Sequence, residues 1–339
     1  MPARTYTSSS VQTYYSALAI PAHVWETMKL YPSTSNIILP YAEKALRAEA
    51  SGTALSGRNL WITYARPGQQ VEFVLSCTEG ALGTYPIFIF TSIPITQIEE
   101  AYLEHPIYLL AKTLLDVVGL ERVFSVFAVE PVTLKFAAVW SELTGINTYA
   151  EPYYDATFSY CTKKSFVNRT TTIHPDLIFE LCLATPDDTE AVARLCRNFA
   201  ATSEPFILSP EKALLEAQLL IQKQQVWIHR ISRVGEEPDI ASMVATTRQS
   251  TDVAAITKVY SNPEWRKLGC AERLVRRVCR DLLSKNERVV LYVGRGNPAA
   301  KVYHRVGFLG LDQANSNIEG VEQWLEIGFD RSRVQLGHW

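Results

Sequence analysis

The sequence has little of several features that would assign a protein class directly. Its 33 basic and 35 acidic residues give a net charge of −2, so its bulk charge does not indicate a nucleic-acid or other polyanionic partner. No apolar run reaches the ~18 residues of a membrane-spanning helix. No apolar secretion signal follows the polar residues 1–10. We therefore expect a cytoplasmic protein that binds neither membrane nor nucleic acid.

Cysteine spacing and glycine-rich motifs are also uninformative. The six cysteines contain no Cys-x-x-Cys pair and fall mostly within apolar segments, which favours reduced, buried thiols and no metal site. The patterns Gly-x-Gly-x-x-Gly and Gly-x-x-x-x-Gly-Lys-Ser/Thr are both missing. Dinucleotide and nucleoside-triphosphate sites therefore lack their usual motifs here.

The length and composition suit a globular chain of two ordinary domains or one very large domain. Hydrophobic residues make up 47% of the 339 and charged residues 20%, which is enough to build a sizeable core. A polar stretch without helical periodicity, residues 163–175, ends at a proline. We place the boundary there and predict domains at residues 1–165 and 173–339.

Residues 259–271 are the most informative segment. An apolar strand, residues 254–259, leads into a turn at Pro263, and a long amphipathic helix begins through the pattern Arg-x-x-Gly-x-Ala. Unpaired N–H groups at a helix N-terminus, together with the helix dipole, form an anion site that suits a pyrophosphate. Gly269 lets the backbone approach such a ligand, and the small Ala271 obstructs little.

The residues after this helix narrow the interpretation. They form an apolar strand at 288–293, the sequence Asn297-Pro298, a short helix carrying Tyr303, and Gly307-Phe308. This order resembles the GNAT superfamily of acyl-CoA-dependent N-acetyltransferases. The wording of residues 259–271 is similar to the subgroup that contains glycine N-acyltransferases. Motifs carry the resemblance over residues 254–311 and element order over 177–329, and it implies an α/β fold with a mixed sheet.

The first half contains a faint copy of the same pattern. A strand at 123–129 leads to Pro131, and Phe136 follows that proline by five residues, as Tyr303 follows Pro298. This predicts two tandem GNAT-like domains, although any strand-turn-helix-strand unit has a similar outline. We also expect a hairpin, a buried strand and a helix, at residues 61–77, 87–93 and 109–118.

The first copy lacks the means to bind a cofactor. It has no Arg-x-x-Gly-x-Ala pattern, and Glu99, Glu100 and Glu104 occupy the approach to its helix, where they would repel a pyrophosphate. Phe136 stands in place of the tyrosine and has no proton to give. We therefore predict a degenerate N-terminal domain and one working site, in the second domain.

The resemblance implies that the cofactor is acetyl-CoA, with CoA as product. In the family, the strand before the loop splays from its neighbour and pairs with the pantetheine arm. Arg266 and Lys267 add charge or simply form a solvated helix start. Asn297 binds the arm, caps the helix, or does both. The predicted cofactor-binding residues are Val259, Tyr260, Ser261, Arg266, Lys267, Leu268, Gly269, Cys270, Ala271, Asn297 and Ala300.

Two residues are expected to be catalytic. The motif assigns Tyr303 as the acid that protonates the CoA thiolate, against the alternative of a core aromatic. Glu204 would bind or deprotonate the amine, against the alternative of a surface acid. A strand-face role suits His229 better than catalysis. Cys270, at a helix N-terminus, is expected to have a lowered thiol pKa, but direct transfer is favoured over an acyl-cysteine.

These observations predict an acetyl-CoA-dependent N-acetyltransferase that acts on the amine of a small molecule, an amino acid or a specialised metabolite, by direct attack in a ternary complex. Two alternatives stay open. The acceptor could instead be a protein N-terminus or lysine, or the chain could be a CoA-binding regulatory protein without turnover. A monomer or homodimer is expected.

Overall fold

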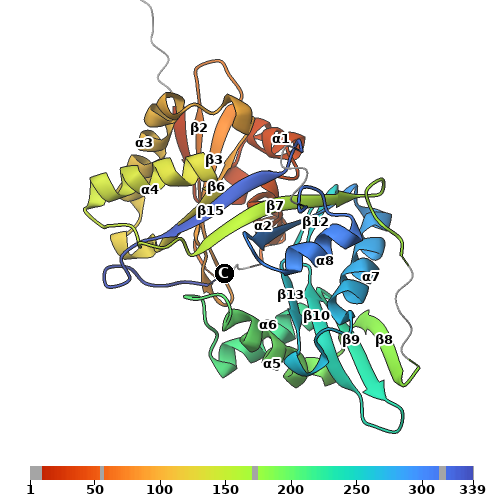
Figure 1. Ribbon diagram of the computed structural model, residues 1–339. Coiled ribbons are helices and arrows are strands. Elements are labelled where there is room, and N and C mark those ends of the chain that lie inside the picture. The colour runs from red at the N-terminus through yellow and green to blue at the C-terminus, as the bar shows by residue number, and fades with distance from the viewer. Residues whose placement is uncertain (1–9, 54–56, 170–174, 313–317, 339) are drawn as a thin grey trace, which may run out of the picture. The chain divides into compact units, whose positions relative to one another are not determined.

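The computed structural model describes residues 10–53, 57–169, 175–312 and 318–338 (Figure 1). The chain forms two compact units, Met1–Asp155 with Gln323–Trp339, and Ala156–Glu322. These units depart from the predicted domains, 1–165 and 173–339, at both ends of the second half. The physical reason is strand pairing. A strand that precedes the predicted boundary pairs within the second unit, and a strand near the end of the chain pairs within the first unit.

The first unit contains a sheet in the order β1-β2-β3-β5-β6-β15. Four of the five neighbouring pairs are antiparallel, and β5 is parallel to β6. In Figure 1 the dark blue β15 lies beside β6, although about 200 residues separate them in sequence. The strands are β1 (Ser10–Tyr14), β2 (Asn59–Ala65), β3 (Val71–Gly80), β5 (Ile87–Thr91), β6 (Ser125–Val129) and β15 (Glu322–Gly328), with the short β4 (Gly83–Thr84) paired to β3.

Among the described residues, four α-helices complete the first unit: α1 (Ala22–Leu30), α2 (Leu39–Ala50), α3 (Glu100–Val117) and α4 (Glu130–Thr144). Helix α3 packs against α4 and β2. The core is rich in phenylalanine, and Phe136 is fully buried with its ring stacked on Trp140 at 5.9 Å between centroids. The acids foreseen near the start of α3 are there, with Glu99 as N-cap and Glu100 in the first turn.

The second unit has two sheets. One has the order β7-β14-β12-β11 and the other β13-β10-β9-β8. The strands are β7 (Tyr154–Thr162), β8 (Leu177–Leu183), β9 (Val226–Arg233), β10 (Asp239–Ala245), β11 (Arg248–Gln249), β12 (Val253–Ala255), β13 (Lys258–Ser261) and β14 (Arg288–Gly294). The helices are α5 (Thr189–Ala200), α6 (Pro210–Gln222), α7 (Cys270–Lys285) and α8 (Ala299–Val306).

Two large apolar clusters form most of the core of the second unit. One joins α7 and α8 to β12 and β14, through residues such as Leu274, Val278 and Leu291. The other joins α5 and α6 to β9 and β10, through residues such as Val192, Ala217 and Met243. The apolar residues on α7 recur every three or four positions, which is why this strongly amphipathic sequence forms a helix with one buried face.

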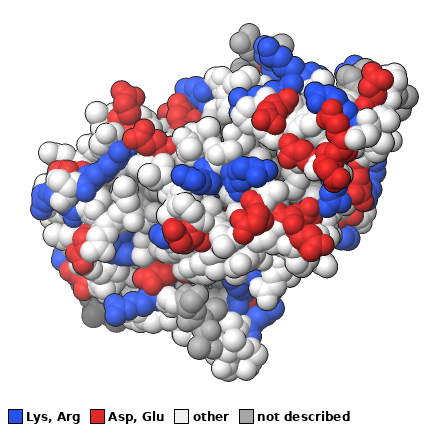
Figure 2. All heavy atoms as spheres, turned by 90° about the horizontal axis from the view of Figure 1, so that it is seen from below, with Lys and Arg blue, Asp and Glu red and all other residues white. Residues whose placement is uncertain are grey.

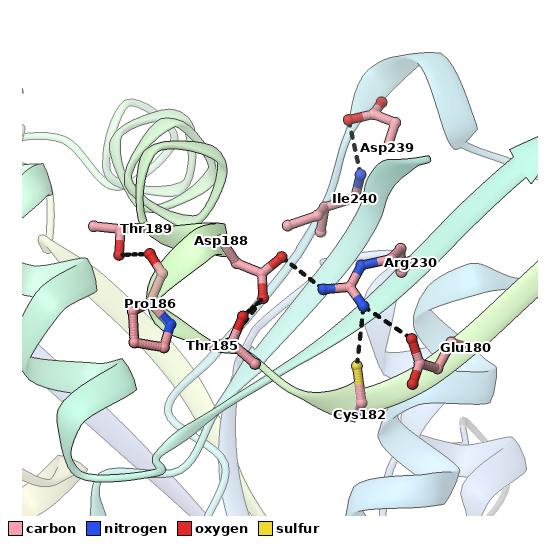
Figure 3. Close-up of polar contacts among 9 residues, drawn as sticks. All are labelled: Glu180, Cys182, Thr185, Pro186, Asp188, Thr189, Arg230, Asp239 and Ile240. Carbon is pink, nitrogen blue, oxygen red and sulfur yellow. Dashed lines mark hydrogen bonds and ion pairs between the residues drawn. The ribbon is translucent and has the colours of Figure 1, made fainter. Parts of the chain in front are cut away.

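An ionic cluster fixes the start of α5 to the neighbouring strands (Figure 3). The Arg230 guanidinium on β9 donates to Asp188 at 2.8 Å and to Glu180 on β8 at 2.9 Å. Asp188 also accepts the N–H of Thr185 at 2.8 Å in a capping box. Burial alone would raise the pKa of Asp188, but the Thr185 hydrogen bonds and Arg230 lower it below its ordinary value. The carboxylate is thereby kept as a charged cap.

The described surface carries both signs of charge. Figure 2 shows basic and acidic side chains interspersed over the face that it displays, in keeping with the near-neutral composition. Among the described residues, no helix combines the length and apolar character needed to cross a membrane.

Candidate functional site

The two sheets of the second unit diverge along one continuous strand segment. Ala255 on β12 is paired with Val290 on β14, and the Ile256 N–H still donates to the Val290 carbonyl at 2.9 Å. The next residue turns away, since the Thr257 N–H donates to the carbonyl of Ala245 at 2.8 Å. From there β13 pairs with β10 instead. The splay that the resemblance implied is therefore present.

In the described part of the chain, the splay leaves one backbone edge of β13 without a paired strand. β13 is the last strand of that sheet, and beyond it the N–H of Asn262 donates to the Ala241 carbonyl at 2.9 Å. Hydrogen-bonded and non-bonded pairs alternate along an antiparallel ladder. The register therefore directs the N–H and C=O groups of Val259 and Ser261 to the edge opposite β10. An extended ligand can pair with this edge.

The same divergence occurs in the first unit. Ile87 and Phe88 of β5 pair in parallel with β6, whereas the end of β5 pairs with β3 alone. The Ser92 N–H then donates to the Glu72 carbonyl at 3.0 Å, as Asn262 does to Ala241. This shared detail supports the duplication read from the sequence.

A sharply turned loop connects β13 to α7. A 3₁₀ turn, Pro263–Trp265, is followed by Lys267 and Gly269, both in the left-handed region with φ of 66° and 73°. Backbone turned in this way directs successive N–H groups to one side, where they can hold an anion. A Cβ built on Gly269 meets nothing within 4 Å, so glycine is needed there for its φ rather than for space inside the protein.

The Arg273 side chain supports this loop from below. Its guanidinium donates to the Leu268 carbonyl at 2.9 Å and lies 5.0 Å from the ring centre of Phe179. The side chain is buried, which sequence reasoning did not foresee. The available signal was the position of Arg273, one turn after Gly269 and next to the apolar Leu274 and Val275 on the buried face of α7.

The thiol of Cys270 does not have the lowered pKa that was predicted. Burial raises its pKa, and the lowering influence of nearby Arg273 does not compensate. The side chain packs with Ile231, Ala241 and Trp265 in a small apolar cluster. The expectation of a lowered pKa was wrong, because the helix N-terminus directs this side chain into the core rather than toward solvent.

The basic side chains of the loop are exposed. Arg266 lies 5.8 Å from the ring centre of Tyr260, and Lys267 is also exposed. Ala271, at the second position of α7, is partly buried. Both basic side chains thus belong to the loop whose backbone N–H groups can hold an anion.

Asn297 caps α8. Its side-chain oxygen accepts the Ala299 N–H at 2.9 Å, and its carbonyl accepts the Ala300 N–H at 3.0 Å. The capping role is therefore present, and the contact of Asn297 with the pantetheine arm stays a prediction. Asn297 is exposed, and Ala300 is partly buried against the core beside α7.

The predicted catalytic residues lie in different settings. Tyr303 on α8 is 7% exposed, with its ring edge-to-face on Phe308 at 5.9 Å between centroids. Glu204 is exposed on the loop between α5 and α6. His229 is fully buried on β9, edge-to-face with Phe179 at 5.4 Å, and burial and Arg273 lower its pKa to about 4. This neutral, packed imidazole has the strand-face role expected for it.

A separate cavity lies at the other end of α8. It has a volume of about 460 Å³ and is lined by residues including Val167, His304, Gly307 and Phe308. None of the predicted cofactor residues lines it. Among the described residues, no cluster of His, Cys, Asp and Glu side chains has a metal-binding arrangement.

Comparisons with known proteins agree with this geometry. The FR47-like protein family model matches residues 235–315, which include the splayed strand, the loop, α7 and α8. Two tandem-length solved structures are similar over nearly the whole chain. The first is a tandem GNAT protein from the clavulanic acid biosynthesis pathway, 13% identical, covering 94% of this chain and 98% of its own, with a TM-score of 0.51.

The second is a GCN5-related N-acetyltransferase from Sphaerobacter thermophilus. It is 14% identical, covers 96% of this chain and 97% of its own, and has a TM-score of 0.54. The chain has the tandem GNAT fold. Identities this low establish the GNAT fold alone, and no curated protein sequence matches the chain.

Proposed function

We propose that this GNAT-fold chain is an acetyl-CoA-dependent N-acetyltransferase that acts on the amine of a small molecule. The observation that carries the proposal is the free edge of β13 running directly into the left-handed loop at the N-terminus of α7. An edge that accepts an extended amide-containing arm, followed by a turn that accepts an anion, matches pantetheine followed by pyrophosphate.

The residues present fit such a cofactor. The backbone of Val259 and Ser261 would pair with the pantetheine arm, and the N–H groups at residues 267–271 would hold the pyrophosphate. The open space around Gly269 is what an approaching phosphate needs. Arg266 and Lys267 add positive charge near it. Bound acetyl-CoA supplies the acetyl group as an activated thioester.

Two side chains would handle protons. In the proposed role, the Tyr303 hydroxyl donates a hydrogen bond to the departing sulfur. The reference pKa values of a phenol and a thiol, about 10 and about 8.5, do not favour complete transfer. Glu204 would bind the ammonium form of the acceptor and take up its proton. The amine then attacks directly in a ternary complex, without an acyl-enzyme intermediate.

The near-neutral charge supports a small acceptor, an amino acid or a specialised metabolite, over a basic protein. We propose a cytoplasmic enzyme that is a monomer or homodimer and has no nucleic-acid or membrane partner.

The test has two stages. Calorimetry with CoA first measures binding. Thiol release from acetyl-CoA is then followed across amino acids, other small amines, and peptides with free N-termini or lysines. Binding with turnover on small amines supports the proposal, and turnover on peptides alone favours the protein-acetylating alternative. Binding without turnover on any amine favours a regulatory protein, and no binding rejects the site.

A further inference from the structure

A single carboxylate joins the β9–β10 hairpin to the turn that precedes the loop. One oxygen of Asp239, Oδ2, accepts the Asn262 side-chain amide at 3.0 Å and the Trp265 indole N–H at 2.7 Å. The other oxygen, Oδ1, accepts the N–H of Ile240 at 2.7 Å. Arg194 approaches it at 3.8 Å. Asp239 is the first residue of β10, so its position is fixed by the sheet.

Asn262 relays this anchor into the backbone. Its side-chain oxygen accepts the Glu264 N–H at 3.2 Å and so caps the 3₁₀ turn Pro263–Trp265. Its own N–H donates to Ala241, and its carbonyl accepts the N–H of Trp265 at 3.0 Å. Every polar group of Asn262 therefore takes part in setting the turn, and the carboxylate fixes which way the side-chain amide faces.

Trp265 carries the anchor to the start of α7. Its ring is buried and packs in one cluster with Ile231, Ala241 and Cys270, the first residue of the helix. The Arg233 guanidinium lies 5.2 Å from its ring centre. The four residues 266–269 that form the loop are thus held between Trp265 and Cys270, two side chains packed in the same place.

We infer that Asp239 is a positioning residue for the pyrophosphate loop, acting through Asn262 and Trp265. The effect of this role on CoA binding rests on the proposed function, whereas the effect of Asp239 on the structure of the loop does not. Fixing both ends of the loop before the ligand arrives reduces the ordering that binding would otherwise require. The expected consequence is a specific effect on CoA affinity rather than on the acceptor or on chemistry.

The test replaces Asp239 by Asn, which keeps the size but removes the charge and supplies a donor where only acceptors are used. CoA affinity by calorimetry should fall about tenfold, as expected when charge-assisted hydrogen bonds are lost. The KM for acetyl-CoA should rise by a similar factor, with kcat and the acceptor KM nearly unchanged. Glu237→Gln, the same change on an exposed acid of the same hairpin, should match wild type.

Trp265→Phe provides a second variant in case Asp239→Asn folds poorly. It keeps an aromatic ring in the cluster and removes only the indole N–H, so CoA affinity should fall severalfold. Hydrogen exchange at the amides of residues 266–271, measured without ligand, should accelerate in both variants and not in Glu237→Gln.

This second readout separates the two proposals. If the wild-type protein does not bind CoA but hydrogen exchange is faster in the variants, the positioning role of Asp239 is supported and the proposed function is rejected. The positioning role would be overturned if both variants bind CoA as tightly as wild type does, or if their hydrogen exchange is unchanged. Equal losses in kcat, the acceptor KM and CoA affinity would also overturn it, since they indicate general destabilisation.

Discussion

The Gly269 carbonyl accepts the N–H of Arg273 at 3.0 Å, and the Arg273 side chain returns to donate to Leu268. The first turn of α7 is therefore closed on the loop twice, once by backbone and once by guanidinium. Gly269 is the N-cap and has no side chain to satisfy the first N–H groups of the helix. Those groups face the space in front of Gly269, where an anion would lie.

Substituting Gly269 by Glu should abolish CoA binding. The new side chain enters open space, so it places a carboxylate where the pyrophosphate is expected, and the positive φ adds strain of about 1 kcal/mol. Calorimetry with CoA should show at least a hundredfold loss of affinity.

Gly235→Glu is the matched control. Gly235 also has a positive φ, of 88°, and open space around its Cβ, but lies in the β9–β10 turn. It should bind CoA like wild type. Unchanged affinity in Gly269→Glu would remove the loop from the site.

Tyr303→Phe should lower turnover at least about tenfold and leave CoA affinity within about twofold. The phenyl ring can keep the edge-to-face packing on Phe308, so the melting temperature should change little. Steady-state kinetics and calorimetry on the same preparation separate these effects. Wild-type kinetics in the variant would place Tyr303 in the core only.

Cys270→Ala should keep turnover within about twofold. The thiol is buried and its pKa is raised, so little of it is thiolate near neutral pH, and no acyl-cysteine is expected. Removing a packed side chain should cost about 1 kcal/mol of stability, seen by chemical denaturation. Loss of turnover at full stability, or a mass shift of one acetyl group on Cys270, would instead establish a covalent mechanism.

Local patterns made the loop and α7 predictable. Pro263, Gly269 and the amphipathic repeat after them each restrict the backbone within a few residues, and the structure follows them closely. The helix predicted at 109–118 begins earlier, at Glu100, because Pro106 is tolerated inside it. A proline usually ends such a helical pattern, and here tertiary packing overrides that preference.

Long-range pairing could not be read from the sequence. Strand β7 pairs with β14 and strand β15 with β6, so each compact unit is completed by a strand that lies far away in sequence. A period-two pattern shows which face of a strand is buried but not which strand lies beside it. The hydrogen bonds of Asp239 could not be predicted for the same reason, since its partners are 23 and 26 residues away.

Acid should destabilise the second unit through His229. In the folded protein, burial and Arg273 lower the pKa of this imidazole to about 4, whereas an unfolded histidine titrates near 6.5. Between these values the unfolded chain binds the extra proton, so stability is complete above the unfolded pKa and is lost as the pH falls toward 4. This contribution to the loss should be about 2 kcal/mol between pH 7.5 and pH 5.

Chemical denaturation of wild type and His229→Gln at these two pH values tests this prediction. The variant cannot titrate, so its stability should change with pH by about 2 kcal/mol less than that of wild type, whatever its stability at pH 7.5. His304→Gln, at an exposed position on α8, should keep the wild-type pH dependence. If the stability of wild type and of His229→Gln changes equally with pH, burial and Arg273 do not lower the pKa of His229 in the folded protein, and the prediction is wrong.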